Sequence, residues 1–502
     1  MLSAAATRSS RIIPSTALLS RVRSAHVLPK LAFNPKAWPS TVASTKDTVD
    51  LEALQAKLEE SGVKYLMPSF IDMHGVPKTK MVPVSHLVGC SRGSELFTGA
   101  AVDGVPQAIS DDEVCAVADP ATMASILPYR PDVCYMPASL YYHGGQFEPC
   151  SRNIYSRQAA KAKDMGFMFK LGMEAEFFVL KDSPNLDVMR SQQPFDDLEN
   201  LHKPCYDAAR LVDNLPWLSE MVEAMDGLGW GVYSFDHEDA VGQFEIDFEF
   251  CEGGKMADRF NFLRMMSCSI ARKHGAYATW MPKPREDRTG SGAHLNVSLH
   301  DYETEANLFK RADGADGLSE VGSHFLGGVM KHLDSITAVA CPTVNSYKRM
   351  VWSPPTAGEG EAQGGFSWAP VFASHGDNNR TNAIRVPAKG RFEIRAADSA
   401  VNPHLAAALT LAAGLEGIEQ KIDPGPSRGY ENLYAAAGSE TTPRLPKDLG
   451  EAVDRFEADP LAKAVFGPAM HKAWVGYKRS EWNEYCKHVS EWEVKRYLRQ
   501  YG

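Results

Sequence analysis

The sequence predicts an α+β protein in which helices pack outside a large sheet, and not a doubly wound parallel sheet. Long helical patterns with recognisable ends are separated by short strands in which polar and apolar residues alternate. No G-x-G-x-x-G motif follows a strand and opens a helix, and the sequence contains no P-loop. The chain has 502 residues, which is too long for one compact core, so two or more domains are expected.

The first 40 residues are predicted to be a transit peptide and are left out of the fold. The first acidic residue is Asp47, and the segment before it is rich in Ser, Ala and Leu. Arg21-Val-Arg23 favours a mitochondrial over a plastid address, with a cytoplasmic location ranked third. A disordered tail without an address is the alternative. The basic residues of this segment are Arg8, Arg11, Arg21, Arg23, Lys30, Lys36 and Lys46.

The overall composition is that of a globular protein, with 44% hydrophobic and 23% charged residues. No apolar stretch reaches the roughly 18 residues that a membrane span requires. The formal net charge of −10 argues against a nucleic-acid partner. The nine cysteines form no C-x-x-C pair, which indicates free thiols in a reducing compartment and not a disulfide framework or a zinc site.

Residues 50–140 are predicted to form a small N-terminal domain built on a sheet. Residues 50–62 have a helical pattern. The stretch KYLMPSFIDMHGVPKTKMVPVSHL predicts a hairpin that turns at Met73, His74, Gly75 and Val76. The elements that follow are short and rich in turn residues, which favours a compact α+β unit.

Residues 145–502 are predicted to form a larger domain with longer elements. Helical patterns cover 153–166, 213–229 and 255–275, each ending in glycine, and residues 473–502 are typical of amphipathic helix. A further helix covers 402–420, with Asn402 as its N-cap and Pro403 in its first position. Strands lie between these helices, so this part is a sheet with helices outside it.

Four predicted strands in this domain carry charged or polar residues on one face, because alternate residues of a strand point the same way. The opposite faces are apolar, and in one strand the residues expected to face a core are Phe244, Ile246, Phe248 and Phe250. The polar sets are Glu174 and Glu176; Glu245, Asp247 and Glu249, preceded by Glu238; His294, Asn296 and Ser298; and Arg391, Glu393 and Arg395.

In the simplest interpretation, these polar faces are turned to water. Exposed strand faces, however, usually carry mixtures of Thr, Lys, Ser and Gln, whereas these carry clustered carboxylates and one imidazole. Such a set is typical of sites for hard divalent cations such as Mg²⁺ or Mn²⁺, which would also cancel the repulsion between Glu174 and Glu176.

Arginines concentrated in the same part of the chain suit phosphate and carboxylate oxygens. Together with the predicted metals they indicate phosphoryl transfer, and a two-metal hydrolase is the competing chemistry. These arginines are Arg349, Arg380, Arg385, Arg391 and Arg395.

From about residue 50 to about residue 420 the sequence resembles the glutamine synthetase family. Six landmarks occur in the order found in that family: GMEAEFF, HEDAVGQFE, GSGAHLNVSL, NSYKRM, NRTNAIRVP and GRFEIRAADSAVNPHLA. The resemblance implies a small N-terminal β-grasp domain and a catalytic domain whose curved antiparallel sheet lines a funnel-shaped active site. It also implies a homo-oligomeric ring, often two stacked rings, with active sites between subunits.

The activity implied by the resemblance is the ATP-dependent ligation of ammonia to the γ-carboxylate of L-glutamate through γ-glutamyl phosphate. Two divalent cations, Mg²⁺ or Mn²⁺, are implied in each site. By motif, one would be held by Glu176, Glu238 and Glu245, and the other by Glu174, His294 and Glu393.

The same motifs imply how the substrates are held. Arg349 and the backbone of Gly290 would bind the α-carboxylate of glutamate, and Arg395 its side-chain carboxylate. Arg380, Arg385 and Arg391 would stabilise ATP and the transferred phosphoryl group, with Arg380 and Arg395 as the catalytic pair. Asn296 and Ser298 would lie near the nucleotide, and the family often has a second histidine where Asn296 stands.

Two departures from the family pattern fall at the expected amine site. The family's F-D-G-S-S is FTGAA here, so Thr98 replaces an aspartate that helps to bind ammonium. The loop after NSYKRM is long, and neither Glu359 nor Glu361 aligns cleanly with the glutamate that closes the ammonium pocket. Ammonia is the default acceptor by family frequency, and methylamine or a larger alkylamine is the alternative. A protein that kept the fold without activity is expected to lose metal ligands first, and all six are present.

Overall fold

The structure, a computed structural model, describes residues 49–120, 125–181, 204–351, 368–434 and 442–501. The predicted transit peptide and the loop residues Glu359 and Glu361 lie outside these ranges. Residues 42–502 form one compact unit, so the predicted division between residues 140 and 145 stays a prediction. In the described part of the chain, no helix combines the length and the apolar character needed to cross a membrane.

The first part of the chain forms an eight-stranded sheet with strand order β2-β1-β7-β5-β4 and three short strands paired to β1 or β7. Strands β1 and β7 run parallel, whereas β1 and β2 form the antiparallel hairpin predicted from the sequence. Gly75 turns this hairpin with φ +80° and donates its N–H to the Asp72 carbonyl at 3.1 Å. The elements are α1 (Leu51–Glu60), β1 (Tyr65–Ile71), β2 (Pro77–Thr79), β3 (Val82–Pro83), η1 (Val84–His86), α2 (Leu87–Cys90), β4 (Glu95–Phe97), η2 (Gly99–Ala101), β5 (Val114–Ala118), β6 (Ser125–Leu127), β7 (Arg130–Tyr142) and β8 (Gly145–Gln146).

Two further sheets carry the charged faces. One has four strands in the order β11-β12-β10-β14, and the other has six in the order β13-β9-β15-β18-β17-β16. Their strands are β9 (Phe167–Met173), β10 (Ala175–Lys181), β11 (Val232–His237), β12 (Gln243–Phe248), β13 (Cys251–Glu252), β14 (Ala276–Thr279), β15 (Leu295–Asp301), β16 (His375–Asp377), β17 (Ile384–Ala388) and β18 (Arg391–Ile394).

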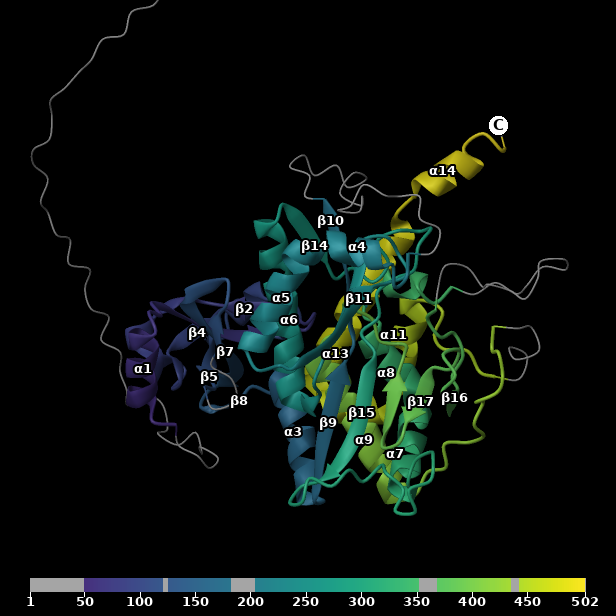
Figure 1. Cartoon of the computed structure of the whole chain (residues 1–502), viewed down its shortest axis with the longest axis horizontal. Coiled ribbons are helices and arrows are strands. Elements are labelled where there is room, and N and C mark those ends of the chain that lie inside the picture. Colours follow the sequence, from purple (N-terminus) through teal and green to yellow (C-terminus); the bar gives the residue numbers. More distant parts are fainter. Residues whose placement is uncertain (1–48, 121–124, 182–203, 352–367, 435–441, 502) are drawn as a thin grey trace, which may run out of the picture. The chain divides into compact units, whose positions relative to one another are not determined.

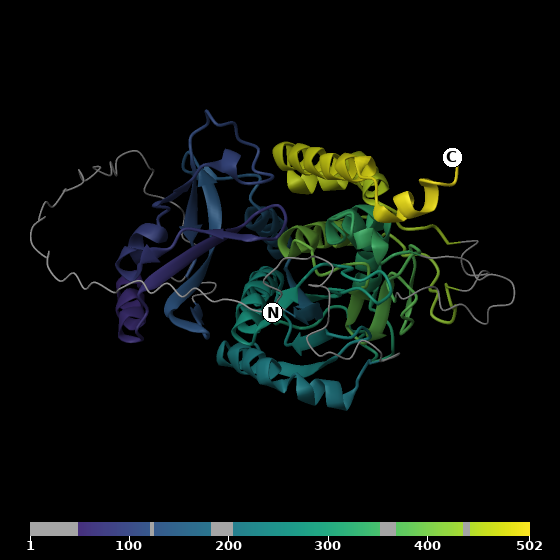
Figure 2. The ribbon, with the colours of Figure 1, turned by 90° about the horizontal axis from the view of Figure 1, so that it is seen from above.

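Helices surround these two sheets, as the α+β prediction requires (Figure 1). Helix α9 packs against α3, α6 and α7, and the C-terminal helices α11 to α13, yellow in Figure 2, pack on one another. The Asn402 side chain accepts the N–H groups of His404 and Leu405 and caps α9 as predicted. The helices are α3 (Ser151–Asp164), α4 (Ala208–Asp213), α5 (Leu215–Gly227), α6 (Gly253–Lys273), α7 (Glu320–Lys331), α8 (Leu333–Ala340), η3 (Ser346–Lys348), α9 (Pro403–Gln420), α11 (Leu449–Ala458), α12 (Pro460–Phe466), α13 (Pro468–Lys487) and α14 (Glu491–Tyr497).

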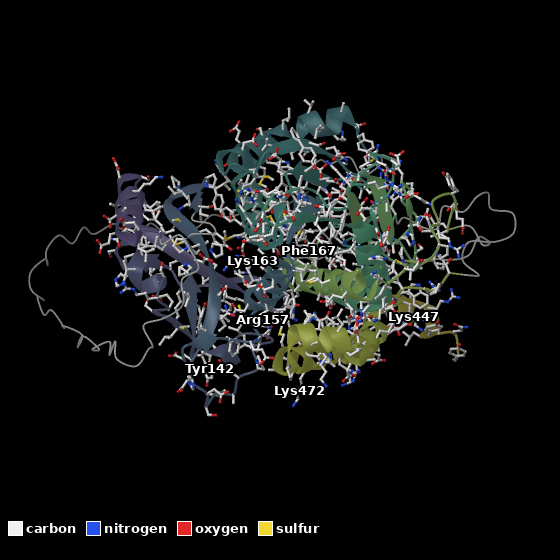
Figure 3. All side chains as sticks on the ribbon, turned by 90° about the horizontal axis from the view of Figure 1, so that it is seen from below. Tyr142, Arg157, Lys163, Phe167, Lys447 and Lys472 are labelled. Atoms are coloured by element: carbon white, nitrogen blue, oxygen red, sulfur yellow. The ribbon has the colours of Figure 1, made fainter. Side chains whose placement is uncertain are left out.

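The chain passes from the six-stranded to the four-stranded sheet at Glu174. Strand β9 ends at Met173 in the six-stranded sheet, and β10 begins at Ala175 in the four-stranded sheet. The connection before β9 is also short, because α3 ends at Asp164 and β9 begins at Phe167. Lys163 of α3 and Phe167 are labelled in Figure 3. The result is a mixed α+β fold with a curved, half-barrel sheet, as predicted.

Two details of the strand predictions are wrong. Glu174 and Glu176 were expected on one strand, but Glu174 lies between β9 and β10, at the junction between the sheets. Phe250 does not face the core: Phe244, Ile246 and Phe248 are buried, but Phe250 is 56% exposed because β12 ends at Phe248.

Candidate active site

The charged faces of the two curved sheets line one cavity of about 850 Å³. Strands β10, β11 and β12 form one wall, and the ends of β9, β15, β17 and β18 form the other. Among the residues that line it are ten of the predicted site residues: Glu174, Glu176, Glu238, Glu245, Gly290, His294, Arg349, Arg380, Arg385 and Arg395.

One cluster of possible metal ligands consists of Glu174, His294 and Glu393, with one ligand atom from each lying within 4.8 Å of the others. The His294 Nδ1 atom lies 2.7 Å from Glu174 Oε2 and 3.4 Å from Glu393 Oε1. Glu174 comes from the β9–β10 junction, His294 precedes β15, and Glu393 lies in β18. Three segments far apart in the sequence therefore meet because β9, β15 and β18 are neighbours in one sheet.

A second cluster consists of Glu176, Glu238 and Glu245, again within 4.8 Å. Glu176 and Glu245 are directly paired across β10 and β12, so their side chains lie on the same face of the sheet. Glu176 Oε2 accepts the backbone N–H of Gly292 at 2.7 Å and the side-chain N–H of Gln243 at 3.1 Å. Those donors fix one oxygen of Glu176, while Glu238 is anchored by the N–H of Asp239 at 2.9 Å.

The electrostatics of the two clusters differ. Burial raises the pKa of Glu174, but the hydrogen bond and charge of His294 outweigh it and lower the pKa to about 2. In the second cluster, burial and the charge of Glu176 raise the pKa of Glu238 to about 7, and they raise the pKa of Glu245 well above its usual value. The second cluster therefore brings three carboxyl groups together, with the His294 Nε2 atom 3.9 Å from Glu176 Oε1.

The donor set fits divalent cations such as Mg²⁺ or Mn²⁺. Both clusters offer mainly carboxylate oxygens, and the first adds one imidazole nitrogen, which are ligands that such ions accept. A cation between Glu176, Glu238 and Glu245 would remove the repulsion that, together with burial, raises the pKa values of Glu238 and Glu245. The assignment of these six side chains as metal ligands stays a prediction.

The predicted arginines surround the first cluster. Arg385 Nη1 donates to Glu393 Oε2 at 3.0 Å, and Arg395 Nη1 donates to Glu393 Oε1. The Arg395 Nε–H is buried and has no hydrogen-bond partner among the described residues, so it is available to an anion in the cavity. Arg380 is exposed at the cavity and also lines it.

Gly290 and Arg349 lie against each other at the deep end. A Cβ atom on Gly290 would come within 2.5 Å of Arg349 Cγ, so only glycine allows this approach. Arg349 Nη1 donates to the Ala396 carbonyl at 3.2 Å and lies 4.0 Å from Asp398 Oδ2. Burial and the charge of Arg349 lower the pKa of the neighbouring Lys283 to about 8.

Three predicted nucleotide contacts lie outside the lining of this cavity. Asn296 donates to Glu174 Oε1 at 2.9 Å and accepts a hydrogen bond from Arg391 Nη1, so these two side chains support the first cluster from behind. The Ser298 hydroxyl is buried and hydrogen-bonded to His300 at 3.2 Å. Thr98 is exposed at the N-cap of η2, directly after β4 of the N-terminal sheet.

Several residues that line the cavity were given no role from the sequence, although Asp247 belongs to one of the polar strand faces described above. Asp236 is paired with Glu245 across β11 and β12, and Asp247 lines the same wall; burial and a neighbouring glutamate raise the pKa of each to about 6. The alternation of Ser234, Asp236 and Glu238 in the stretch YSFDHE was the signal for the first of them. Tyr206 and Trp368 also line the cavity, and the sequence around them carries no such pattern.

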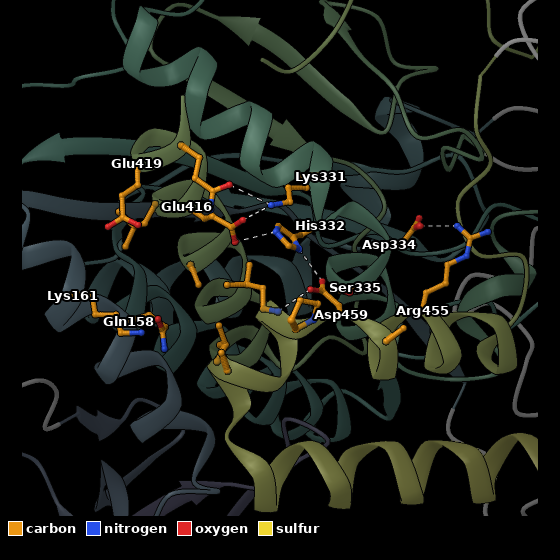
Figure 4. A pocket seen from close by; sticks show the side chains of 18 of the residues that line it. Gln158, Lys161, Lys331, His332, Asp334, Ser335, Glu416, Glu419, Arg455 and Asp459 are labelled. Carbon is orange, nitrogen blue, oxygen red and sulfur yellow. Dashed lines mark hydrogen bonds and ion pairs between the residues drawn. The ribbon is translucent and has the colours of Figure 1, made fainter. Parts of the chain in front are cut away.

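Another cavity, of about 930 Å³, lies between α3, α9 and α12, and its charged groups largely pair with one another. Figure 4 shows His332 between Glu416 and Asp459, with Lys331 also reaching Glu416. The His332 ring nitrogens lie 2.9 Å from Asp459 Oδ2 and 3.2 Å from Glu416 Oε2. This arrangement ties helices together, and we assign no chemistry to it.

Comparisons with known proteins agree on one family. The model of the glutamine synthetase catalytic domain matches residues 148–497. A glutamine synthetase from Rhizobium meliloti is 37% identical over 450 residues, which cover 89% of this chain and 98% of the relative. A glutamate–methylamine ligase from Methyloversatilis universalis is 35% identical over 454 residues, covering 88% and 98%. A solved GmaS/ADP complex has a TM-score of 0.81 and 34% identity, covering 89% of this chain and 99% of its own.

These relatives correct the predicted location. Residues 1–40 were expected to direct the protein to mitochondria, with plastids as the alternative. The relatives come from bacteria and archaea, which have neither organelle. The mitochondrial prediction is therefore wrong, because a basic, Ser-rich start is a compositional signal that does not by itself specify an address.

Proposed function

This chain belongs to the glutamine synthetase family, and we propose that it is an ATP-dependent ligase that joins ammonia to the γ-carboxylate of L-glutamate. The products would be glutamine, ADP and phosphate, with γ-glutamyl phosphate as the intermediate. The observation that carries the proposal is the convergence of two three-residue donor clusters and four arginines on one cavity. Such a site can activate a carboxylate, because it neutralises phosphoryl charge and positions the acceptor.

We assign the glutamate end of the cavity to Arg349, Gly290 and Arg395. The Arg349 guanidinium would bind the α-carboxylate, and the small Gly290 keeps that guanidinium close to the backbone. Arg395 would orient the γ-carboxylate toward ATP, using the buried Nε–H that has no partner among the described residues.

Arg380 and Arg385 would bind oxygens of the transferred phosphoryl group, and Arg391 would support this end through Asn296. Two divalent cations, Mg²⁺ or Mn²⁺, would neutralise the ATP phosphates when held by the two clusters. Asn296 and Ser298 stay proposed neighbours of the nucleotide. Arg385 has more direct support as a nucleotide contact, because it lines the cavity and neither of the other two does.

The amine would enter beside Glu238, where the cavity wall also carries Asp236 and Asp239. Their negative charge would attract a cationic amine, and a carboxylate there could take the proton that ammonium must lose before it attacks. Thr98, the residue at the position of the family's ammonium-binding aspartate, lies outside this cavity within one chain, so it would act only from a neighbouring subunit.

A methylamine ligase is the second candidate, and a specific feature of the cavity favours it. Tyr206 and Trp368 line the cavity and are 72% and 60% exposed, and the Trp368 indole donates to Asp239 Oδ2 at 3.3 Å. Aromatic faces beside a carboxylate suit a methylated ammonium ion through cation–π attraction. Tyr206 also has φ +63°, a conformation that bulky residues adopt rarely and mostly at functional sites.

The test is ATP-dependent phosphate release from the full chain with glutamate and Mg²⁺, comparing ammonium, methylamine, ethylamine and no amine. We expect the highest kcat/KM with ammonium. A strong preference for methylamine would make methylamine the acceptor in place of ammonia, and the proposed phosphoryl transfer would be unchanged. Phosphate release that needs no ATP would instead identify a hydrolase, and no amine-dependent release at all would refute the ligase.

A further inference from the structure

A further cavity of about 850 Å³ lies between the β1–β2 hairpin turn, helix α6 and helix α13. It is separate from the proposed active site, and the two cavities share no lining residue. The side chains that matter for its chemistry are His74, Arg264, Trp280, Tyr477, Lys478 and Glu484.

Arg264 is a positive charge that the described part of the chain leaves without an ion-pair partner. Its Nη1 and Nη2 groups donate to the carbonyls of Gly75 and Val401, and its guanidinium packs over the rings of Phe260 and Trp280. The Nε–H is buried and has no hydrogen-bond partner among the described residues. Burial lowers the pKa of Arg264 to about 10, which reflects the cost of a guanidinium that lacks a close counter-charge.

The other residues that line this cavity limit the kind of ligand that could pair with the charge of Arg264. Lys478 is buried but already paired with Glu481 at 2.9 Å, and the exposed Glu484 adds a negative charge at the rim. These carboxylates disfavour a polyanion such as a nucleotide and leave room for one negative group. Trp280 and Tyr477 provide aromatic surface, and the buried His74 Nε2 atom makes no hydrogen bond among the described residues and lies 3.9 Å from Asp103 Oδ2.

We propose that this cavity binds a small organic carboxylate with an apolar or aromatic body, its carboxylate paired with Arg264. A guanidinium in a partly desolvated pocket binds a carboxylate through charge-assisted hydrogen bonds. The apolar body would lie against Trp280 and Tyr477, and a ligand that also carries an ammonium group would place it toward Glu484.

The site is connected to Arg349 of the proposed glutamate site through one turn of the chain. Arg264 holds the Val401 carbonyl, the Val401 N–H donates to the Asp398 carbonyl at 3.1 Å, and Asp398 Oδ2 lies 4.0 Å from Arg349. Asp398 is buried, so its negative charge acts on both guanidinium groups. A ligand carboxylate paired with Arg264 would take over part of the role of Asp398 there, so the negative charge of Asp398 would act more fully on Arg349. Arg349 would then bind the carboxylate of glutamate less tightly. This coupling rests on the proposed function, whereas binding at Arg264 does not.

Binding is tested by isothermal titration calorimetry of the full chain with benzoate, and with benzamide as a neutral ligand of the same shape. We expect benzoate to bind at least about tenfold more tightly than benzamide, because only the anion pairs with Arg264. Absence of benzoate binding, or equal binding of the two ligands, would overturn the proposal.

Variants locate the binding site. Arg264→Gln is expected to weaken benzoate about tenfold or more, whereas Arg272→Gln, the same change at an exposed position of α6, should leave binding unchanged. Ser480→Trp, which would fill the cavity from its rim without touching Arg264, should also abolish binding and covers the case in which Arg264→Gln does not fold. Arg349→Gln should bind benzoate normally. Loss in Arg349→Gln, or no loss in either cavity variant, would place benzoate elsewhere and overturn the proposal.

The coupling is tested by the KM for glutamate in the presence of benzoate. We expect an increase of about fivefold in the wild-type protein and none in Arg264→Gln, whose benzoate response should be absent. Benzoate binding without a change in KM would refute the coupling. If the protein shows no ligase activity at all, the calorimetric comparison still decides the site, so the two proposals fail separately.

Discussion

At the scale of single residues, Glu245 shows how strongly the fold concentrates charge. On one side of β12 it is directly paired with Glu176 of β10, and on the other side with Asp236 of β11. Like charges placed directly opposite each other in a sheet destabilise it, so a sequence would not keep three carboxylates here for stability alone. Burial and then this repulsion raise the pKa values of Glu238, Glu245 and Asp236, and a divalent cation would relieve the repulsion.

A pH dependence of stability follows from these shifts. A carboxyl group with a higher pKa in the folded than in the unfolded chain holds its proton more tightly when folded, so its stabilising contribution is lost as pH rises toward the folded pKa. For Asp236 and Glu238 this loss runs from about pH 4, the unfolded value, to about 6 and 7. We expect the metal-free protein to lose thermal stability across this window, and added Mg²⁺ to stabilise it more at pH 8 than at pH 5.

Thermal unfolding at both pH values, with and without Mg²⁺ and at matched ionic strength with NaCl, measures this effect. A Mg²⁺ shift in Tm that is the same at pH 5 and pH 8, or that NaCl reproduces, would mean that these carboxylates do not bind the cation.

Residue patterns predicted the chemistry of the site better than its full membership. Glu174, Glu176, Glu245, His294 and Glu393 were found because strand alternation places polar residues on one face. Asp236 was missed although it shares that alternation, because nothing in the sequence says that β11 lies beside β12. Arg391 and Ser298 share the polar faces of their strands with site residues, yet neither lines the cavity. Alternation predicts which face of the sheet a residue occupies, but not where along the strand the cavity lies.

At the scale of elements, the ends of strands proved harder to predict than their faces. The stretch from 172 to 180 reads as one strand, but the chain changes sheets at Glu174. The break depends on long-range pairing of β9 with β15 and of β10 with β12, which a local pattern does not contain. The helix over 402–420 was predicted closely, because its cap at Asn402 is a local signal. The predicted helix over 473–502 is instead divided into α13, which begins at Pro468, and α14.

Helices α8, α9 and α12 are joined by the His332 contacts shown in Figure 4. His332 is buried and precedes α8, Glu416 lies in α9, and Asp459 caps α12. We expect His332→Ala to lower the free energy of unfolding by about 1–3 kcal/mol, because it leaves two partly buried carboxylates without their shared partner. Catalytic activity should be retained, since none of these residues lines the proposed active site.

Urea denaturation of His332→Ala, beside His86→Ala at an exposed position, measures this contribution. Equal stability of the two variants would show that the contacts do not join the helices in solution.

At the scale of the whole molecule, the C-terminal helix α14 leaves apolar side chains uncovered. Trp492 and Leu498 are 62% and 74% exposed, and Val489 and Tyr501 are exposed beside them. Several exposed apolar side chains at one short helix suit an interaction site, and a second copy of the chain is the partner expected from the ring that the family resemblance implies.

We therefore expect the protein to sediment as a homo-oligomer, and Trp492→Glu with Leu498→Glu to reduce its mass while leaving the chain folded. Sedimentation velocity and circular dichroism test both statements, with Tyr430→Glu, a fully exposed aromatic residue outside this helix, as the control. A wild-type protein that sediments as a monomer would refute the proposed assembly. An unchanged mass in the double variant would place the interface elsewhere.

The central claim is that two clusters of side chains from separate strands each hold a divalent cation. Calorimetric titration of the metal-free chain with Mn²⁺ tests it most directly, using Glu245→Gln and, as the control, Glu249→Gln at the exposed acid that follows β12. We predict two ions per chain for the wild type and Glu249→Gln, and one for Glu245→Gln, which should remain folded but lose turnover. Two ions bound to Glu245→Gln with the wild-type affinity, or none bound to the wild type, would contradict the account.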